Sequence, residues 1–255
     1  AALFLAQTSL ERQSSALRLT MLDVGHGESI VVEWPSGEVW LVDGGPPSRG
    51  VLQYLRRRGV GRLDVVVLTH GHLDHAGGLW PVVEEMEIGV IWFGSSWDDR
   101  IVHRAAERGI PIVLEPKEAY KPVQGSDNTQ SLVLPIHWGP FSALLTGDVG
   151  FKAESELGPQ MDAPVDVLKV AHHGSKESSS GAFLDRVQPR IALISASGAY
   201  GLPHPETLER YRQRGIQVLR TDTMGTIELE IEGDRIRAWH HQAGAGWRGL
   251  PVSGH

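Results

Sequence analysis

Short apolar runs alternate with amphipathic stretches along the chain. Runs rich in Val, Ile and Leu, bounded by glycine, proline or charged residues, are typical of buried strands. Between them, apolar residues recur every three or four positions, which predicts helices. In the first half the pattern predicts strands at 17–22, 30–33, 39–42, 64–69 and 90–93, and helices at 51–58, 79–87 and 99–108.

The second half has the same style. It predicts strands at 130–136, 141–146, 165–170, 191–195, 217–220, 226–232 and 235–240, and helices at 179–187 and 205–214. Two similar halves favour an α/β architecture of two mixed sheets packed face to face, with helices outside. We expect one domain over residues 1–255, with a core at about 17–240 and a frayed tail after His241.

Composition agrees with such a domain. The chain has 255 residues and is 41% hydrophobic, enough to bury a full core. It lacks an apolar run of the roughly 20 residues that a membrane helix needs, and the start at Ala1 lacks the basic flank of a signal peptide. Because it starts with Ala1 rather than Met, we expect a piece of a longer protein. Zero cysteines exclude disulfides and thiolate ligands.

Metal-binding residue types gather at the end of one apolar run. His70, His72, Asp74 and His75 follow the run at 63–68 directly. A divalent cation needs several imidazoles or carboxylates within about 2.0 to 2.2 Å. We expect His70 and His72 to bind one cation, and Asp74 and His75 a second one about 3.5 to 4 Å away. A chance cluster of surface histidines is the alternative.

Three other strand ends offer further groups. Asp148 ends the run at 142–146, and its two carboxylate oxygens suit a bridge between two cations. His172 and His173 end the strand at 165–170. Adjacent side chains on an extended segment point to opposite sides, so we expect one ligand, assigned to His173, with His172 beside the substrate, although the sequence leaves their order open. Asp43 is predicted to orient a ligating histidine.

These motifs resemble a known superfamily. His70-x-His72-x-Asp74-His75, followed by Asp148 and a late histidine, is similar to the metallo-β-lactamase superfamily, which implies an αββα sandwich. The segments at 21–29 and 171–176 resemble motifs of ComEC-type DNA uptake channels. Further agreement lies at 128–134, 203–206 and 219–222, so that the resemblance runs from about 19 to 239.

Departures from the family pattern concern the first cation. Where the superfamily has a further histidine, this chain offers Asp127 and Asn128. Oxygen ligands favour Mn²⁺, whereas affinity alone favours Zn²⁺, so we expect two divalent cations, Mn²⁺ or Zn²⁺. His26 and Glu28 replace the family's Gln and Asp. Leu202 stands where the family often has the first histidine of an H-P-H-P motif, so His204 is the histidine of that motif that this chain keeps. His137 is expected at a hairpin turn rather than in the site.

The expected chemistry is hydrolysis. Two cations lower the pKa of a shared water toward about 7 and neutralise charge on a phosphodiester. Asp74 and Asp148 would hold this water, while His172, His204 or Lys169 would stabilise the leaving oxygen. Ser175 is a candidate hydrogen-bond partner for a phosphate. The alternative for Lys169 is a solvent-facing strand residue, and for Ser175 a simple turn.

Charge bears on the substrate. The formal net charge of −7 and the pI near 5.9 are the reverse of the basic stripe of strong nucleic-acid binders. The ComEC resemblance nevertheless implies action on DNA. We therefore predict a metal-dependent DNA nuclease domain with weak intrinsic affinity for DNA, degrading the non-transported strand.

The resemblance also implies where the domain works. We expect it at the extracytoplasmic face of the bacterial plasma membrane, as a soluble part of a multi-pass membrane protein. Its partners would be DNA and the channel portion of the same polypeptide, with no stable oligomer. Two alternatives stay open. One is a small-molecule phosphodiesterase, such as a phosphorylcholine esterase, and the other is a noncatalytic, metal-stabilised module that guides DNA.

Overall fold

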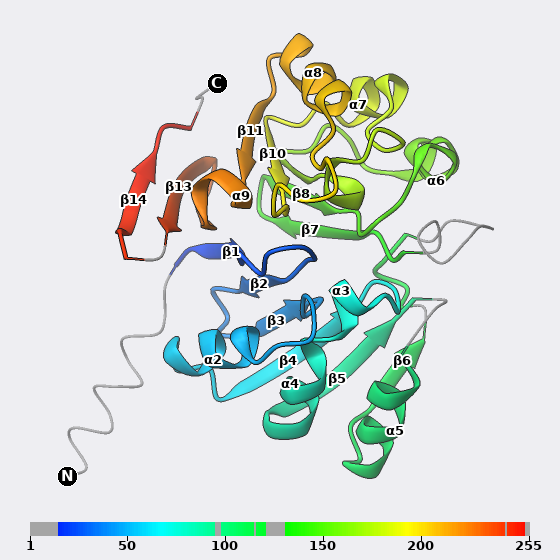
Figure 1. Ribbon diagram of the computed structural model, residues 1–255, viewed down its shortest axis with the longest axis vertical. Helices are drawn as coiled ribbons and strands as arrows, with labels where there is room; N and C mark the ends of the chain where they lie inside the picture. The colour runs from blue at the N-terminus through cyan, green and yellow to red at the C-terminus, as the bar shows by residue number, and fades with distance from the viewer. Residues whose placement is uncertain (1–14, 95–97, 115, 121–130, 243, 253–255) are drawn as a thin grey trace.

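Two sheets pack face to face, and helices cover the outer side of each (Figure 1). The computed structural model describes residues 15–94, 98–114, 116–120, 131–242 and 244–252. Apolar side chains form one core between the sheets, a second under the helices of the larger sheet and a third under those of the smaller sheet. The predicted αββα sandwich is confirmed.

The larger sheet joins strands from both ends of the chain. Its order is β14 (Gly246–Leu250), β13 (Arg235–Gln242), β12 (Thr226–Glu232), β1 (Leu17–Met21), β2 (Ile30–Glu33), β3 (Val39–Val42), β4 (Arg62–Leu68), β5 (Glu87–Phe93) and β6 (Ile112–Leu114). Pairing is antiparallel from β14 to β3 and parallel from β3 to β6. The two halves of the sequence therefore do not correspond to the two sheets. Strands β12 to β14 cover the edge of β1 that would otherwise be unpaired.

The smaller sheet comes from the second half alone. Its order is β11 (Gln217–Arg220), β10 (Ile191–Ile194), β9 (Val167–Lys169), β8 (Phe141–Leu145) and β7 (Leu134–Trp138). Strands β8 to β11 run parallel, and β7 forms an antiparallel hairpin with β8. His137 lies near the hairpin turn, at the opposite end of β8 from Asp148, as the sequence suggested.

The longer helices each pack an apolar face against the outer side of one of the sheets. The larger sheet carries α2 (Gly50–Arg57), α3 (Leu73–Ala76), α4 (Leu79–Glu85) and α5 (Asp99–Glu107). The smaller sheet carries α6 (Phe151–Leu157), α7 (Gly181–Val187) and α8 (Pro205–Gln213), with the short η2 (Gly158–Gln160), η3 (Ala171–Gly174) and α9 (Thr221–Met224) in the connections. The start of α5 is fixed by its N-cap, because the Asp98 side chain accepts hydrogen bonds from the backbone N–H groups of Arg100 and Ile101. Across the described residues, every helix is too short or too polar to cross a bilayer.

Two expectations about elements were wrong. The tail after His241 was expected to fray, yet β14 pairs with β13 over Ala238 to Gln242. Strand β14 is mostly exposed, so its sequence carries no apolar alternation. Helix α6 was not predicted, although its inner face buries Ala153 and Leu157.

Parallel pairing brings the carboxyl ends of several strands to one edge of the sandwich. Strands β3 and β4 are parallel neighbours, as are β8, β9 and β10. A backbone hydrogen bond from Leu132 N to Thr69 O, 3.0 Å long, ties the two groups of strands together at this edge. The residues that follow these strands are Asp43, Thr69, His70, Asp148, His172, His173 and Ser195.

Candidate metal centre

A buried carboxylate organises the loop after β4. Asp43 accepts hydrogen bonds from Thr69 N at 2.8 Å and from Thr69 Oγ1 at 2.7 Å. Its Oδ2 also lies 2.7 Å from Nδ1 of His75. Because a carboxylate only accepts, Nδ1 of His75 is the donor, and Nε2 is directed away from Asp43. The structure thus places Asp43 where the sequence predicted an orienting group.

Four side-chain atoms from three segments converge beyond this loop. Nε2 of His75 lies 3.4 Å from Oδ2 of Asp148 and 3.9 Å from Oδ2 of Asp74. Nε2 of His173 lies 3.4 Å from Oδ2 of Asp74 and 3.7 Å from Oδ2 of Asp148. Four ligands arranged tetrahedrally at about 2.1 Å from one cation lie about 3.4 Å apart. The spacing of these four atoms therefore fits a single divalent cation.

The outward ring nitrogens have the environment of metal ligands. Nε2 of His70, His75 and His173 is buried without a hydrogen-bond partner, and so is Oδ1 of Asp148. On the opposite side of its ring, His173 directs Nδ1 to the carbonyl oxygen of Ser195 at 3.0 Å. Buried polar atoms without a partner are costly, so they need an explanation such as an ion. The residues present fit a divalent cation.

Electrostatics also favour a cation. Burial opposes a charged His75 ring, yet the carboxylates of Asp148 and Asp43 raise the pKa of His75 well above its ordinary value. Burial likewise opposes ionisation of Asp148, but His75 and His173 lower the pKa of its carboxyl well below the usual range. Asp74 also has a lowered pKa, against burial, through His173 and His75. The centre thus attracts positive charge, which a divalent cation supplies on displacing the protons.

A second group of ligand types adjoins the first. Nε2 of His70 lies 4.0 Å from Oδ2 of Asp148, and the rings of His70 and His72 are 4.7 Å apart. Burial and the neighbouring His75 lower the pKa of His70 to about 3, so the ring is neutral and able to bind metal. His72 is exposed and precedes α3. Oδ2 of Asp148 therefore lies within 4.0 Å of Nε2 of His70 in the second group and of both His75 and His173 in the first.

Ser131 supports this second group, and the sequence had not singled it out. Its hydroxyl lies 3.3 Å from Nδ1 of His70 and accepts a hydrogen bond from Asp148 N at 3.1 Å. One small side chain thereby contacts both the ring of His70 and the backbone of Asp148. The predicted contributors Asp127 and Asn128 lie outside the described residues.

Lys169 does not occupy the solvent-facing position that was one of the two expectations, and its role toward a leaving oxygen stays a prediction. The side chain is fully buried in β9, so it does not face solvent. Its Nζ donates to Gly147 O at 2.7 Å, pairs with Glu28 and lies 3.7 Å from Oδ1 of Asp148. Burial acts to lower the pKa of Lys169, but the Glu28 and Asp148 carboxylates raise it. The ammonium thus stays charged beneath Asp148.

The two adjacent histidines are not on an extended segment. His172 and His173 both have positive φ, 50° and 53°, inside η3. This left-handed geometry, rather than strand alternation, separates the rings, whose centroids are 6.3 Å apart. His173 enters the buried group, while His172 is partly buried and has a pKa lowered by that burial. The sequence argument, that His172 and His173 point to opposite sides because they lie on an extended segment, was therefore wrong.

Ser175 and His204 lie on the segments next to η3. His204 caps α8, where its Nδ1 accepts from Glu206 N at 3.2 Å. Its own backbone N donates to Gly174 O at 2.8 Å. The hydroxyl of Ser175 accepts from Glu177 N at 3.3 Å, which is the turn geometry of the simpler interpretation. Roles for these residues in contacting a substrate remain predictions.

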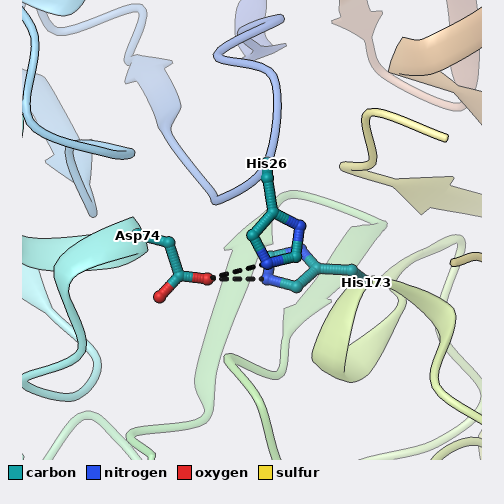
Figure 2. A group of neighbouring side chains, drawn as sticks. All are labelled: His26, Asp74 and His173. Carbon is teal, nitrogen blue, oxygen red and sulfur yellow. Dashed lines mark ion pairs between the residues drawn. The ribbon is translucent and has the colours of Figure 1, made fainter. Parts of the chain in front are cut away.

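His26 joins the centre from the loop between β1 and β2. Its Nε2 lies 3.6 Å from Oδ2 of Asp74, the same oxygen that faces Nε2 of His173 (Figure 2). The rings of His26 and His173 are 5.0 Å apart, and the exposed ring of Tyr200 lies 4.7 Å from that of His26. The sequence had identified His26 only as a replacement for a glutamine.

Comparison with known proteins agrees with this geometry. A family model described as the metallo-beta-lactamase superfamily matches residues 22–99, which include the loop after β4. The chain belongs to the metallo-beta-lactamase superfamily. Among solved structures, Tm1679, titled a metal-dependent hydrolase of the beta-lactamase superfamily, superposes with a TM-score of 0.58 at 14% identity. That match covers 85% of this chain and 98% of Tm1679, and it shows the shared fold.

Curated relatives match over most of the length of this chain. ComE operon protein 3 of Bacillus subtilis (strain 168) is 31% identical over 262 residues, covering 86% of this chain and 34% of that protein. Competence protein ComA of Neisseria gonorrhoeae is 34% identical over 233 residues, covering 86% of this chain and 33% of that protein. The chain thus spans about a third of the length of these relatives.

Proposed function

We propose that this metallo-beta-lactamase domain is a metal-dependent DNA nuclease. The observation that carries the proposal is the convergence of buried, unpartnered histidine nitrogens with Asp74 and Asp148 at one edge of the sandwich. The similarity to competence proteins supports DNA as the substrate. We further propose that the domain belongs to a membrane channel for DNA uptake and acts outside the membrane, on the strand that is not transported.

The proposed ligand sets share Asp148. His70 and His72 would hold one divalent cation, and Asp74, His75 and His173 the other, with Mn²⁺ and Zn²⁺ as the candidates. When bound, two such cations lower the pKa of a shared water and neutralise charge that builds on a phosphodiester.

Hydrogen bonds from neighbouring residues fix the orientation of the proposed ligands. Asp43 fixes the ring of His75, and the carbonyl of Ser195 fixes that of His173. Ser131 holds both His70 and the backbone of Asp148. Ligands fixed before the substrate arrives need no rearrangement during the reaction, which is the main source of electrostatic stabilisation in such sites.

Binding of DNA is proposed to be weak in the isolated domain. The net charge of −7 opposes association with a polyanion, and the cations of the centre are the local positive charge that a phosphate would meet. A channel that delivers DNA to the domain would remove the need for a basic surface.

A cleavage assay tests the proposal. The domain is incubated with labelled single- and double-stranded DNA, or with bis(p-nitrophenyl) phosphate, in EDTA or in Mn²⁺, Zn²⁺ or Mg²⁺. We expect DNA cleavage with Mn²⁺ or Zn²⁺ that is abolished by EDTA. Asp74→Ala should reduce it by roughly 100-fold or more. His137→Ala removes an exposed histidine distant from the centre and is the matched control.

The contrary outcomes are distinct. Cleavage of the small ester alone would replace the nuclease with a small-molecule phosphodiesterase. No turnover with any metal and any substrate, by a folded protein that binds metal, would leave a noncatalytic DNA-guiding module.

A further inference from the structure

We infer that His26 is an additional ligand of the cation held by Asp74, His75, His173 and Asp148. The inference rests on the proposed metal centre, but not on DNA as its substrate. One ligand atom from each of His26, Asp74 and His173 lies within 4.8 Å of the others. Figure 2 shows Nε2 of His26 and of His173 both directed at one oxygen of Asp74.

The spacing suits coordination to one ion. Ligands at about 2.1 Å from a cation are about 3 Å apart when adjacent in an octahedron, 3.4 Å apart in a tetrahedron and at most about 4.2 Å apart. Nε2 of His26 lies 3.6 Å from Oδ2 of Asp74, within this range. The Asp74–His173 separation, at 3.4 Å, is nearly the same. His26 therefore extends the four-atom group by one further nitrogen.

The loop that carries His26 is fastened to the centre on both sides. Glu28 N donates to the backbone oxygen of Asp74 at 3.1 Å, and Ser195 Oγ donates to Gly27 O at 2.6 Å. Ser195 is also the residue whose carbonyl orients His173. At Gly27, with φ of 130°, a Cβ would collide with the Asp74 carbonyl, so only glycine permits this approach. The loop that carries His26 is thus held by Asp74, itself a proposed ligand, and by Ser195, which orients His173.

Ring contacts restrict His26 further. Its ring contacts that of His173, 5.0 Å away, and that of Tyr200, 4.7 Å away. Tyr200 thus packs against His26 from the solvent side.

An asymmetry between the two cations follows. With His26, one cation has five proposed protein ligands, whereas the other has His70, His72 and the shared Asp148 within the part of the chain that is described, where His75 also lies within 4.8 Å of His70 and Asp148. The first equivalent of metal should therefore enter the site of His26 with higher affinity. The second should bind more weakly, at the site of His70 and His72.

Metal binding without DNA tests the inference. Metal-free protein is titrated with Zn²⁺ by calorimetry and with Co²⁺ by visible absorption, for the native chain, His26→Ala, His26→Phe and the control His137→Ala. His26→Phe keeps an aromatic ring beside His173 and Tyr200 but removes the nitrogen. We expect both His26 variants to bind the first equivalent about 10- to 100-fold more weakly. Their Co²⁺ bands should change in intensity as the coordination number falls, whereas His137→Ala should match the native chain.

Each other outcome is decisive. First-equivalent affinity and Co²⁺ spectra equal to those of the native chain would show that His26 is not a ligand. An effect confined to the second equivalent, or to His26→Ala alone, would overturn the inference as well, because it would assign His26 to the other site or to packing. Absence of metal binding by the native chain would instead overturn the proposed metal centre itself.

Discussion

Asp43 is fully buried, yet it controls the ring that lies at the middle of the candidate centre. Its two oxygens hold Thr69 and His75 at 2.7 to 2.8 Å. We expect Asp43→Asn to weaken the binding of the first metal equivalent by about 10- to 100-fold, because an amide no longer fixes the ring with a negative charge. Calorimetric titration with Zn²⁺ measures this.

The matched control for Asp43 lies at the other end of the same part of the sheet. Asp64 also accepts a backbone hydrogen bond, from Val39 N at 2.9 Å, but it is at the start of β4. Asp64→Asn should leave metal affinity unchanged. Equal affinity of Asp43→Asn and the native chain would contradict the orienting role of Asp43.

Lys169 and Glu28 form a buried ion pair beneath Asp148. Removing one partner leaves the other buried charge without its ion-pair partner, whereas removing both leaves neither member of the pair. We expect Lys169→Met to lower the free energy of unfolding by about 3 to 5 kcal/mol. The double variant Glu28→Gln/Lys169→Met should recover a large part of that loss. Urea unfolding of the metal-free proteins measures both values, and a double variant no more stable than Lys169→Met would show that the charges are not coupled.

The sequence could reveal a candidate centre because its ligand types cluster at strand ends. His70, His72, Asp74 and His75 lie within six positions, so their proximity follows from local chain geometry. His26 and Ser131 could not be found in this way. Their contacts with Asp74 and His70 join segments 48 and 61 positions apart, and depend on how two sheets pack. Burial of Lys169 likewise follows from its neighbours rather than from its own segment.

At the scale of elements, periodicity located most strands and helices, and three of the strands in the first half have nearly the predicted bounds. Periodicity failed to reveal strands that are mostly exposed or very short. Strand β14 is exposed, and β6 is a short edge strand, so neither shows a pattern. The joining of β12 to β1 was also beyond the sequence, because the pairing partner of an edge strand depends on the whole sheet.

The loop after β3, at Gly44 and Gly45, packs against the start of α4, and this contact between elements positions Asp74 and His75. Gly44 N donates to His75 O at 2.7 Å, and Gly78 N donates to Gly45 O at 2.9 Å. A Cβ at Gly78 would collide with the carbonyl of Gly44. We expect Gly78→Ala to destabilise the fold by about 1 to 3 kcal/mol and to weaken metal binding, because α3 must shift.

A second glycine provides the control for that substitution. Gly61 also lacks a positive φ, and a Cβ there meets open space. Gly61→Ala should leave the urea midpoint and metal affinity nearly unchanged. If Gly78→Ala behaved like Gly61→Ala, the close approach of the β3 loop and α4 would not be what positions α3.

At the scale of the whole molecule, folding gathers acidic groups in a protein that is already acidic. The net charge is −7, and Asp43, Asp148 and Glu28 are all buried around the centre. Cations that bind only the folded state stabilise it by mass action, by about 2.7 kcal/mol at a hundredfold excess over Kd. For a chain of this size, that corresponds to a rise in Tm of about 5 to 10 °C.

Metal removal should therefore lower the melting temperature by this amount. Calorimetric scans of one preparation, with EDTA or with Zn²⁺ or Mn²⁺ at about a hundredfold excess over Kd, measure the difference. Asp148→Asn should abolish most of it, since this residue contacts both ligand groups. The control His137→Ala should keep the full difference. A Tm that is independent of metal in the native chain would mean that buried Lys169 and a protonated His75 already neutralise the carboxylates, and that these side chains form a self-sufficient polar core rather than a metal centre.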